Sequence, residues 1–160
     1  MFIAYCDCYS GISFEMFLGA MVDAGLPLQE LLDEVNNLIP NRQYEITTQH
    51  VIRNKIRARK LQLIPVDKNE MSHPAQAFIS NLDAKKLITS SDLKPGIKQK
   101  SLDILRLLVD AETSVYGIPI DEYSVQDKIP IKTVVEIISG ITGIDYFNIR
   151  TLYCSALPWG

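Results

Sequence analysis

The sequence is poor in the residues that build most metal centres and disulfide frameworks. Among 160 residues there are three cysteines and two histidines: Cys6, Cys8, Cys154, His50 and His73. An odd cysteine count does not complete a disulfide framework, and a closed zinc site needs four ligands. Because residues i and i+2 of a strand share a face, a site built on Cys6 and Cys8 stays open as an alternative if Cys154 lies beside them.

Long apolar runs and an excess of one charge are also missing. No run approaches the roughly 20 residues that span a bilayer, and the N-terminus lacks the basic region of a signal peptide. With 16 basic and 19 acidic residues the net charge is only -3, so no dominant basic field favours nucleic acid. We therefore expect a cytoplasmic protein that binds neither membranes nor nucleic acid. The hydrophobic content of 47% is typical of a globular domain.

Familiar catalytic motifs are absent as well. The chain contains no G-x-S-x-G, no Walker loop, no G-x-G-x-x-G and no H-E-x-x-H. The residues alone therefore predict no nucleophile-and-base set.

Apolar periodicity is present and predicts an α+β fold. The expected elements are a strand over 1–8, helices over 13–24 and 27–38, strands around 44–48 and 61–65, helices over 73–87, 97–116 and 131–141, and a strand over 148–154. This order is typical of a split β-α-β-β-α-β-like sheet, antiparallel or mixed, covered by helices. We expect one domain over 1–160, with a helical sub-lobe around 73–145.

The stretch C-D-C-Y-S-G-I-S-F-E-M carries the first candidate site residues. Asp7 interrupts an apolar strand at its carboxyl end, the edge where ligands meet side chains in sheet-and-helix folds, and a carboxylate there needs a partner. The alternative is that Asp7 accepts the backbone amides of the following turn. Ser10 and Gly11 could present amides to an anion at the helix start. Glu15 is fully explained as a carboxylate that complements the helix dipole.

Two further charged features allow a structural or a functional interpretation. The cluster Arg53, Lys55, Arg57, Arg59 and Lys60 lies on the connection between the two middle strands. Its pattern favours a solvated hairpin face over an anion site. Glu136 lies within the apolar run of residues 134–138, where it marks either the exposed edge of a helix or a carboxylate that faces a cleft.

The opening stretch also resembles a known family. D-C-Y-S-G-I-S-F-E-M-F-L-G-A-M-V-D-A-G is similar to the opening D-C-F-S-G-I-S-G-D-M-x-L-G-A-L-L-D-x-G of the nickel-insertion proteins of lactate racemase maturation, the LarC family. The resemblance continues through residues 91–93 and the helix that follows. Residues 115–122 resemble its V-H-G-x-P-x-E-E, and residues 152–160 its Y-x-S-P-L-P-x-G.

The resemblance implies a function in cofactor maturation. Members of this family use CTP to insert nickel into a pyridinium bis-thiocarboxylate mononucleotide, a cyclometallase reaction that yields the nickel-pincer nucleotide. It implies Asp7, Glu15, Asp127 and Glu136 as surviving acidic metal positions, and Ser10 and Gly11 as a site for the anionic nucleotide. Full-length relatives continue beyond the region that this chain resembles. The implied partners are therefore a separately encoded C-terminal LarC-like protein and, as an alternative, a second copy of this chain.

Departures from the family pattern set two hypotheses against each other. Where the family reads H-F-H-E-V-G, this chain has Ser124 and Gln126 in place of the histidines, and Lys132 replaces an aspartate. Imidazoles bind nickel well, whereas oxygen ligands alone suit manganese or magnesium better. The first hypothesis is a reduced nickel-insertion protein that is inactive as an isolated chain. The second is a noncatalytic binding or regulatory paralogue that kept the fold and lost the metal site. Their difference is geometric: acidic residues that meet in one cleft favour the first, and acidic residues paired with Lys132 or with the hairpin cations favour the second.

Overall fold

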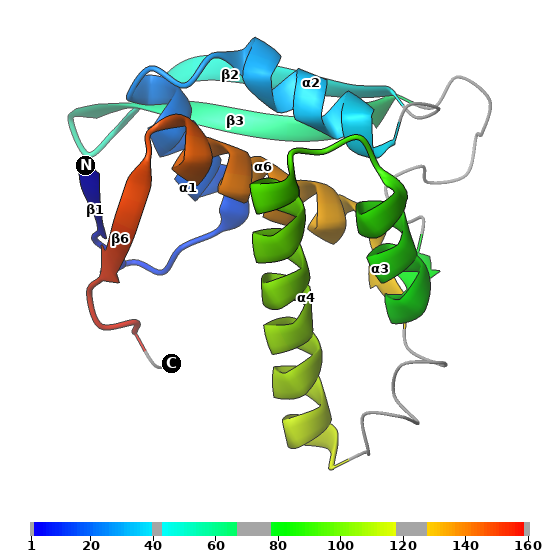
Figure 1. Ribbon diagram of the computed structural model, residues 1–160. Coiled ribbons are helices and arrows are strands. Elements are labelled where there is room, and N and C mark those ends of the chain that lie inside the picture. The colour runs from blue at the N-terminus through cyan, green and yellow to red at the C-terminus, as the bar shows by residue number, and fades with distance from the viewer. Residues whose placement is uncertain (1, 40–42, 67–77, 118–127, 159–160) are drawn as a thin grey trace.

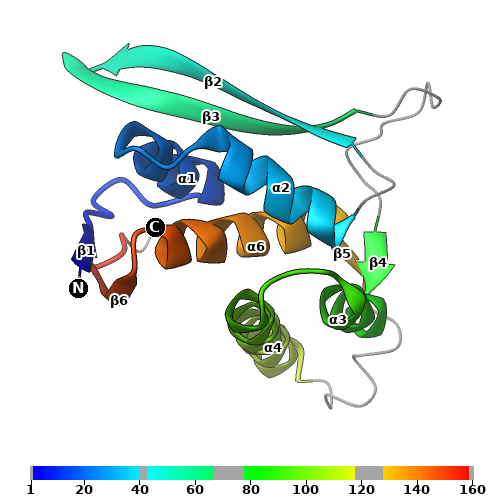
Figure 2. The same ribbon diagram turned by 45° about the horizontal axis from the view of Figure 1, so that its top comes forward.

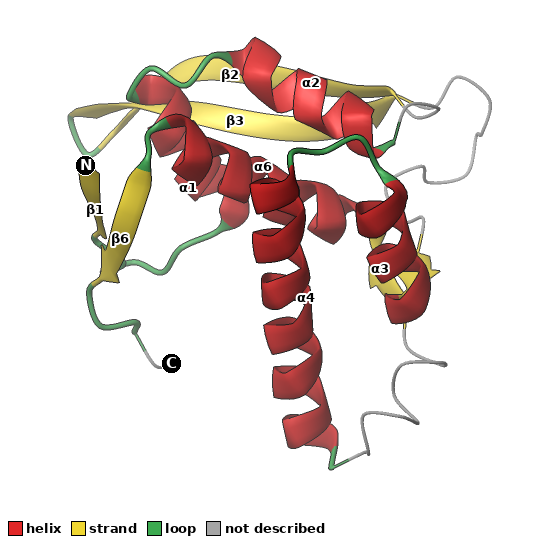
Figure 3. Cartoon of the chain, in the orientation of Figure 1, coloured by secondary structure: helices red, strands yellow, loops and turns green. Residues whose placement is uncertain are grey.

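The predicted helices and strands appear in the predicted order, and two short strands that were not predicted, β4 and β5, are added to them. The computed structural model describes residues 2–39, 43–66, 78–117 and 128–158. Its elements are β1 (Phe2–Cys6), α1 (Phe14–Asp23), α2 (Leu28–Leu38), β2 (Gln43–Arg53), β3 (Ile56–Val66), β4 (Phe78–Ser80), α3 (Asn81–Ser90), α4 (Pro95–Tyr116), β5 (Lys128–Pro130), α6 (Ile131–Tyr146) and β6 (Ile149–Cys154). Figure 3 shows their distribution along the chain. The α+β class is confirmed.

The strands pair as three separate two-stranded sheets, where the sequence led us to expect one split sheet. β1 pairs with β6 in parallel, β2 with β3 antiparallel, and β4 with β5 antiparallel. The first and last strands are therefore neighbours, as the cysteine alternative required. In their register Cys6 lies opposite Cys154.

The elements stack in layers. Figure 2 shows the long β2–β3 hairpin above α1 and α2, with α6 beneath them and with α3 and α4 on the far side. In Figure 1, α4 extends away from the other elements, and β1 and β6 lie side by side at the opposite end from α3. The main apolar core lies where α2, α3, α4 and α6 meet; its fully buried side chains include Val35, Ile88, Leu105, Val134 and Ile138.

A second, smaller core joins α1 to the hairpin. It contains Leu18, Met21, Val22, Leu26, Leu31 and Leu61. Gly19 makes this packing possible, because a Cβ at that position would lie only 2.5 Å from the carbonyl oxygen of Arg59 on β3. The L-G-A stretch of the opening motif therefore has a packing role that involves no ligand.

The hairpin turn is tighter than we expected. The strands extend to Arg53 and from Ile56, so the connection is Asn54 and Lys55 alone, where we expected a connection over residues 53–59. Both residues have left-handed φ, 49° and 66°, which is the requirement of a two-residue type I′ turn. Three of the basic residues, Arg57, Arg59 and Lys60, thus lie on β3 itself.

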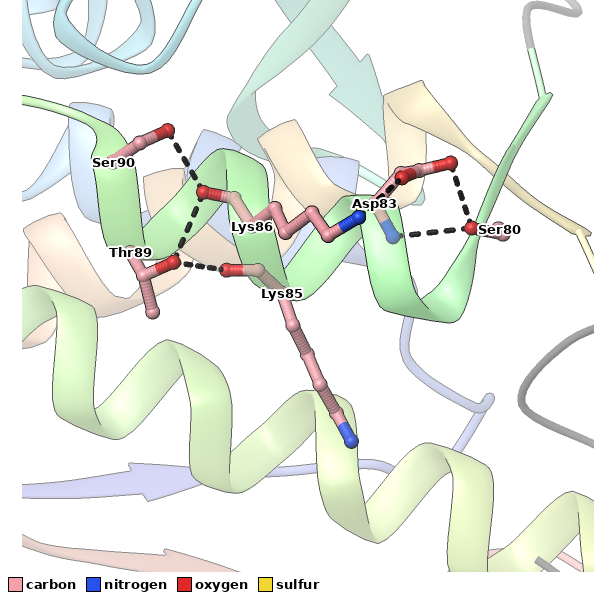
Figure 4. Close-up of polar contacts among 6 residues, drawn as sticks. All are labelled: Ser80, Asp83, Lys85, Lys86, Thr89 and Ser90. Carbon is pink, nitrogen blue, oxygen red and sulfur yellow. Dashed lines mark hydrogen bonds and ion pairs between the residues drawn. The ribbon is translucent and has the colours of Figure 1, made fainter. Parts of the chain in front are cut away.

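Local capping explains where α3 begins. The helix starts at Asn81, later than the predicted 73–87; residues 73–77 lie outside the described residues. Ser80 Oγ accepts a hydrogen bond from the Asp83 amide at 3.1 Å and donates one to the Asp83 carboxylate at 2.8 Å, as Figure 4 shows. This is the usual arrangement of a serine N-cap.

The other helices lie where the sequence predicts them, but α4 begins at Pro95 rather than at residue 97, and α6 ends at Tyr146, five residues beyond the predicted end. Ser13 caps α1 by accepting from the Met16 amide at 3.1 Å. Gly117 closes α4 with a left-handed φ of 66°, the usual glycine conformation at this position. No helix within the described ranges is both long enough and apolar enough to cross a membrane.

Candidate functional site

The site is built around the start of α1, where a strand turns into a helix. β1 ends at Cys6, and the Gly11 amide donates to the Cys8 carbonyl at 2.9 Å. Gly11 has a φ of 85°, which L side chains rarely adopt. The backbone alone therefore closes this turn. The alternative in which the Asp7 carboxylate accepts these amides is not what the structure has: among the described residues that side chain has no hydrogen bond, and it is exposed.

Two of the predicted acidic residues, Glu15 and Glu136, form ion pairs with the same lysine, Lys132. Lys132 Nζ, near the start of α6, donates to Glu15 Oε1 of α1 at 2.9 Å and lies 3.6 Å from Glu136 Oε1. Glu136 is the most buried of the three, with 15% of its side chain exposed. Residues 117 positions apart in the sequence are thus joined by one ammonium group.

Burial and mutual charge perturb this cluster. Burial raises the pKa of the Glu136 carboxyl; the Lys132 ammonium opposes that rise and the Glu15 carboxylate adds to it. The hydrogen bond to Glu15 raises the pKa of Lys132, burial lowers it, and the charges of Glu136 and Glu15 raise it further. The ammonium therefore stays protonated at neutral pH and neutralises part of the carboxylate charge.

The structure does not assemble all four predicted metal positions. Asp7 forms no hydrogen bond or ion pair with the described Glu15–Lys132–Glu136 cluster, and Asp127 lies outside the described residues. Among the residues that the structure describes, no group of three or more histidine, cysteine, aspartate or glutamate side chains could hold a metal ion.

The three cysteines lie near one another at the end of the β1–β6 pair. Cys8 is buried, with 1% of its surface exposed; its amide donates to Ser155 Oγ at 2.7 Å, and the Ser155 amide donates to the Cys6 carbonyl at 2.9 Å. Burial, and then the nearby Cys154, raise the pKa of both the Cys6 and the Cys8 thiols. A thiol with a raised pKa is a weaker nucleophile and metal ligand at neutral pH.

An apolar cavity of about 310 Å³ adjoins these thiols. Its walls come from both strands, α1, α4 and α6, and include Cys6, Cys154, Phe14, Ile104 and Ile137. Phe14 occupies the place of a glycine in the family motif. None of the lining side chains is charged, so the cavity offers apolar contact and two thiols.

A second cavity, of about 580 Å³, lies between α1 and the β2–β3 hairpin. We call it the α1–hairpin groove. Its described lining consists of one face of α1 and the basic end of the hairpin: Ser13, Glu15, Met16, Ala20, Asp23, Val51, Arg53, Arg57, Ala58, Arg59, Lys60 and Leu61. Four of the five basic residues for which the sequence favoured a solvated hairpin face therefore line a groove.

The alternation of residues along β3 could have indicated from the sequence that some of these basic residues face α1. Arg59 and Arg57 lie two and four residues before the buried Leu61, so all three share the face of β3 that packs on α1. The sequence gives no equivalent signal for the pairing of Lys132 with Glu15, because the two are distant in the chain.

Comparison with known protein families gives a consistent result. Residues 4–160 match the family described as "Nickel insertion protein". A "Putative nickel insertion protein" of Citrifermentans bemidjiense is 30% identical over 160 residues, which is the whole of this chain and 40% of that relative. A protein of the same name from Thermomicrobium roseum is 28% identical over 158 residues, or 99% of this chain and 37% of the relative.

One relative has a more specific name. A "Pyridinium-3,5-bisthiocarboxylic acid mononucleotide nickel insertion protein" of Staphylococcus epidermidis is 29% identical over 156 residues, covering 98% of this chain and 38% of its own length. The chain thus spans about two fifths of the length of the curated relatives it matches. No solved structure matches it.

Proposed function

Because this chain belongs to the nickel insertion protein family, we propose that it takes part in maturing the nickel-pincer nucleotide cofactor of lactate racemase. The observation that carries the proposal is the family match over residues 4–160, joined with 30% identity to a relative over the full length of the chain. In this function nickel is cargo, and the acceptor is a pyridinium bis-thiocarboxylate mononucleotide like the one in the name of the Staphylococcus epidermidis relative.

The chain would act with a second polypeptide. It corresponds to about two fifths of its relatives, so we propose that a separately encoded C-terminal LarC-like protein supplies the remainder and the handling of CTP. We propose a cytoplasmic location, self-association as an alternative assembly, and no partnership with nucleic acid or membranes. One domain with a helical sub-lobe around 73–145 stays a prediction.

The acidic cluster limits what the chain does with metal by itself. Lys132 lies between Glu15 and Glu136, and its positive charge repels a divalent cation from the oxygens that would bind it. Asp7 is exposed and could present nickel only together with groups from elsewhere, among them Asp127. The oxygen donors at Asp7, Glu15, Asp127 and Glu136 would suit manganese or magnesium better than nickel. We therefore propose that tight nickel binding needs the partner.

The Lys132 cluster supports a second candidate function. A carboxylate pair that shares one ammonium group can hold two helices together without any metal, which is what a noncatalytic binding or regulatory paralogue would retain. In that case the chain would still bind the C-terminal partner but would deliver no nickel.

Calorimetric titration separates the two candidates. The chain is titrated with nickel and, in parallel, with manganese, alone and with the C-terminal part of a relative. We expect weak binding alone and micromolar nickel binding in the mixture, abolished by Asp7→Ala and unchanged by Asp92→Ala, a control that removes another exposed carboxylate. A mixture that forms but gains no nickel affinity would exclude delivery and favour the noncatalytic paralogue.

A further inference from the structure

The α1–hairpin groove has an uncompensated positive charge. Both of its carboxylates already have partners: Glu15 accepts from Lys132 at 2.9 Å, and Asp23 lies 3.7 Å from Arg59 Nε. Arg59 Nη2 also lies 3.3 Å from His50 Nε2, so this guanidinium is held on two sides. The other three cations of the groove, Arg53, Arg57 and Lys60, form no ion pair with any described residue.

Strand geometry directs part of this charge inward. Arg57 shares the α1-facing side of β3 with the buried Leu61 and Leu63, but it lies past the last apolar contact, near the turn. By the same alternation Arg53 and Lys60 belong to the opposite face of the hairpin, although both line the groove. Inward charges can also protect a sheet edge from pairing with other chains. Such protection of the sheet edge would operate without any bound ligand.

Residues of the opening motif form the opposite wall of the groove. Ser13, Glu15 and Met16 line it, and all three belong to the stretch that resembles the signature of the family. Gly19 holds α1 so close to β3 that its Cβ position lies 2.5 Å from the Arg59 carbonyl, which fixes the two walls relative to each other. A volume of about 580 Å³ is within the range of small-molecule sites.

We propose that the α1–hairpin groove binds the phosphate of a small mononucleotide. Arg57, on the α1-facing side of β3, would bind the phosphomonoester dianion in pairs of hydrogen bonds, and Arg53 and Lys60, which also line the groove, would add positive charge at it. The inference deepens the proposed function and rests on it for the choice of a pyridinium mononucleotide. The recognition of phosphate rests on the groove itself.

The test compares two ligands that differ only in phosphate. The full chain is titrated calorimetrically with nicotinic acid mononucleotide, which has a pyridinium ring, a carboxylate and a ribose 5′-phosphate, and with nicotinic acid riboside, which lacks the phosphate. We expect the mononucleotide to bind at least about tenfold more tightly, and the difference to shrink as salt is raised. Equal binding of the two ligands, or no binding of either at millimolar concentration, would overturn the proposal.

Charge-neutral variants locate the site. Arg57→Gln and Lys60→Gln should each weaken mononucleotide binding about threefold to tenfold, the range expected for a partly exposed charge-assisted contact. Lys55→Gln makes the same change of charge in the turn of the same hairpin, outside the groove lining, and should leave the affinity unchanged. An equal loss with Lys55→Gln would show an effect of net charge alone and overturn the assignment to the groove.

The outcome of the mononucleotide titration can be told apart from the outcome of the nickel titration. Mononucleotide binding that depends on Arg57, in a mixture that gains no nickel affinity, would keep this site and reject nickel delivery. Nickel delivery with an Arg57→Gln variant that binds mononucleotide normally would keep the proposed function and reject the groove as the phosphate site.

Discussion

At the scale of single residues, Lys132 changes the meaning of the acidic candidates. Sequence patterns identified Glu15 and Glu136 as candidate ligands and Lys132 as a departure from the family, but the ion pairs join them into one cluster. Periodicity along one helix cannot foresee a contact across 117 positions. Ser13 was predictable as a helix cap because its hydrogen-bond partner is three residues away. The position of Asp7 at a strand end was also predictable, but the sequence did not show that its side chain has no partner.

The cluster makes a prediction about protonation. In Lys132→Met, the pKa of Glu136 should rise further, because burial and the Glu15 charge persist while the ammonium that opposes them is gone. Carbon-detected NMR titration of the glutamate carboxyls would measure this rise. An unchanged Glu136 pKa would show that the ion pair is not populated in solution.

The same variant should have a pH-dependent loss of stability. A carboxyl whose folded pKa is raised costs stability as pH rises from its unfolded pKa to its folded pKa, and this window extends upward in Lys132→Met. We expect a deficit of about 1 kcal/mol in the free energy of unfolding at neutral pH, narrowing as pH falls through the carboxyl range. Urea unfolding at several pH values measures it, and adding Glu136→Gln to the variant should recover part of the loss.

At the scale of elements, the packing of α1 on the hairpin fixes both the smaller core and the groove. Long periodic segments such as α4 and β6 were predictable because their patterns extend over several turns or alternations. β4 and β5 were not predicted, since three residues give no measurable periodicity and each strand runs directly into a helix. The groove was not predicted because only the apolar residues of β3 were assigned to a face of the strand, and the basic residues near the turn were not.

Gly19 tests the element contact. Gly19→Ala should destabilise the fold by about 1–3 kcal/mol, because the new Cβ would overlap the Arg59 carbonyl, which is backbone and cannot move aside cheaply. Gly96→Ala is the matched control: it lies in α4 with nothing within 4 Å of its Cβ position, and it should stabilise by up to about 1 kcal/mol. Chemical denaturation compares them. If Gly19→Ala proves as stable as Gly96→Ala, α1 does not approach β3 this closely.

At the scale of the whole molecule, the two ends of the described chain are joined. The α+β class was predictable from element order, whereas the pairing of the first and last strands entered only as the condition for a site at the three cysteines. The division into three two-stranded sheets was not, because strand patterns show which residues alternate but not which edges pair. Ser155 secures the junction by accepting from Cys8 and donating to the Cys6 carbonyl.

Removing the Ser155 hydroxyl should weaken that junction. Ser155→Ala leaves the buried Cys8 amide without its acceptor, which should cost about 1–2 kcal/mol of unfolding free energy and speed hydrogen exchange at the Cys8 amide. Ser114→Ala removes an exposed hydroxyl that bonds only within its own helix and should change stability by less than about 0.5 kcal/mol. Similar values for the two variants would mean that solvent replaces the Ser155 acceptor.

The parallel pairing of β1 with β6 also determines how late in synthesis the first strand can find its partner. The Cys8–Ser155 bond spans 147 residues, so at roughly 5–20 residues per second the first strand waits about 7 to 30 s for its partner to be synthesised. During that interval Phe2, Ile3 and Tyr5, which are exposed even in the folded chain, form an apolar strand with two open edges. Such a strand is a template for pairing with other nascent chains, so β1, directly before the N-terminal signature, is a segment that needs protection during synthesis.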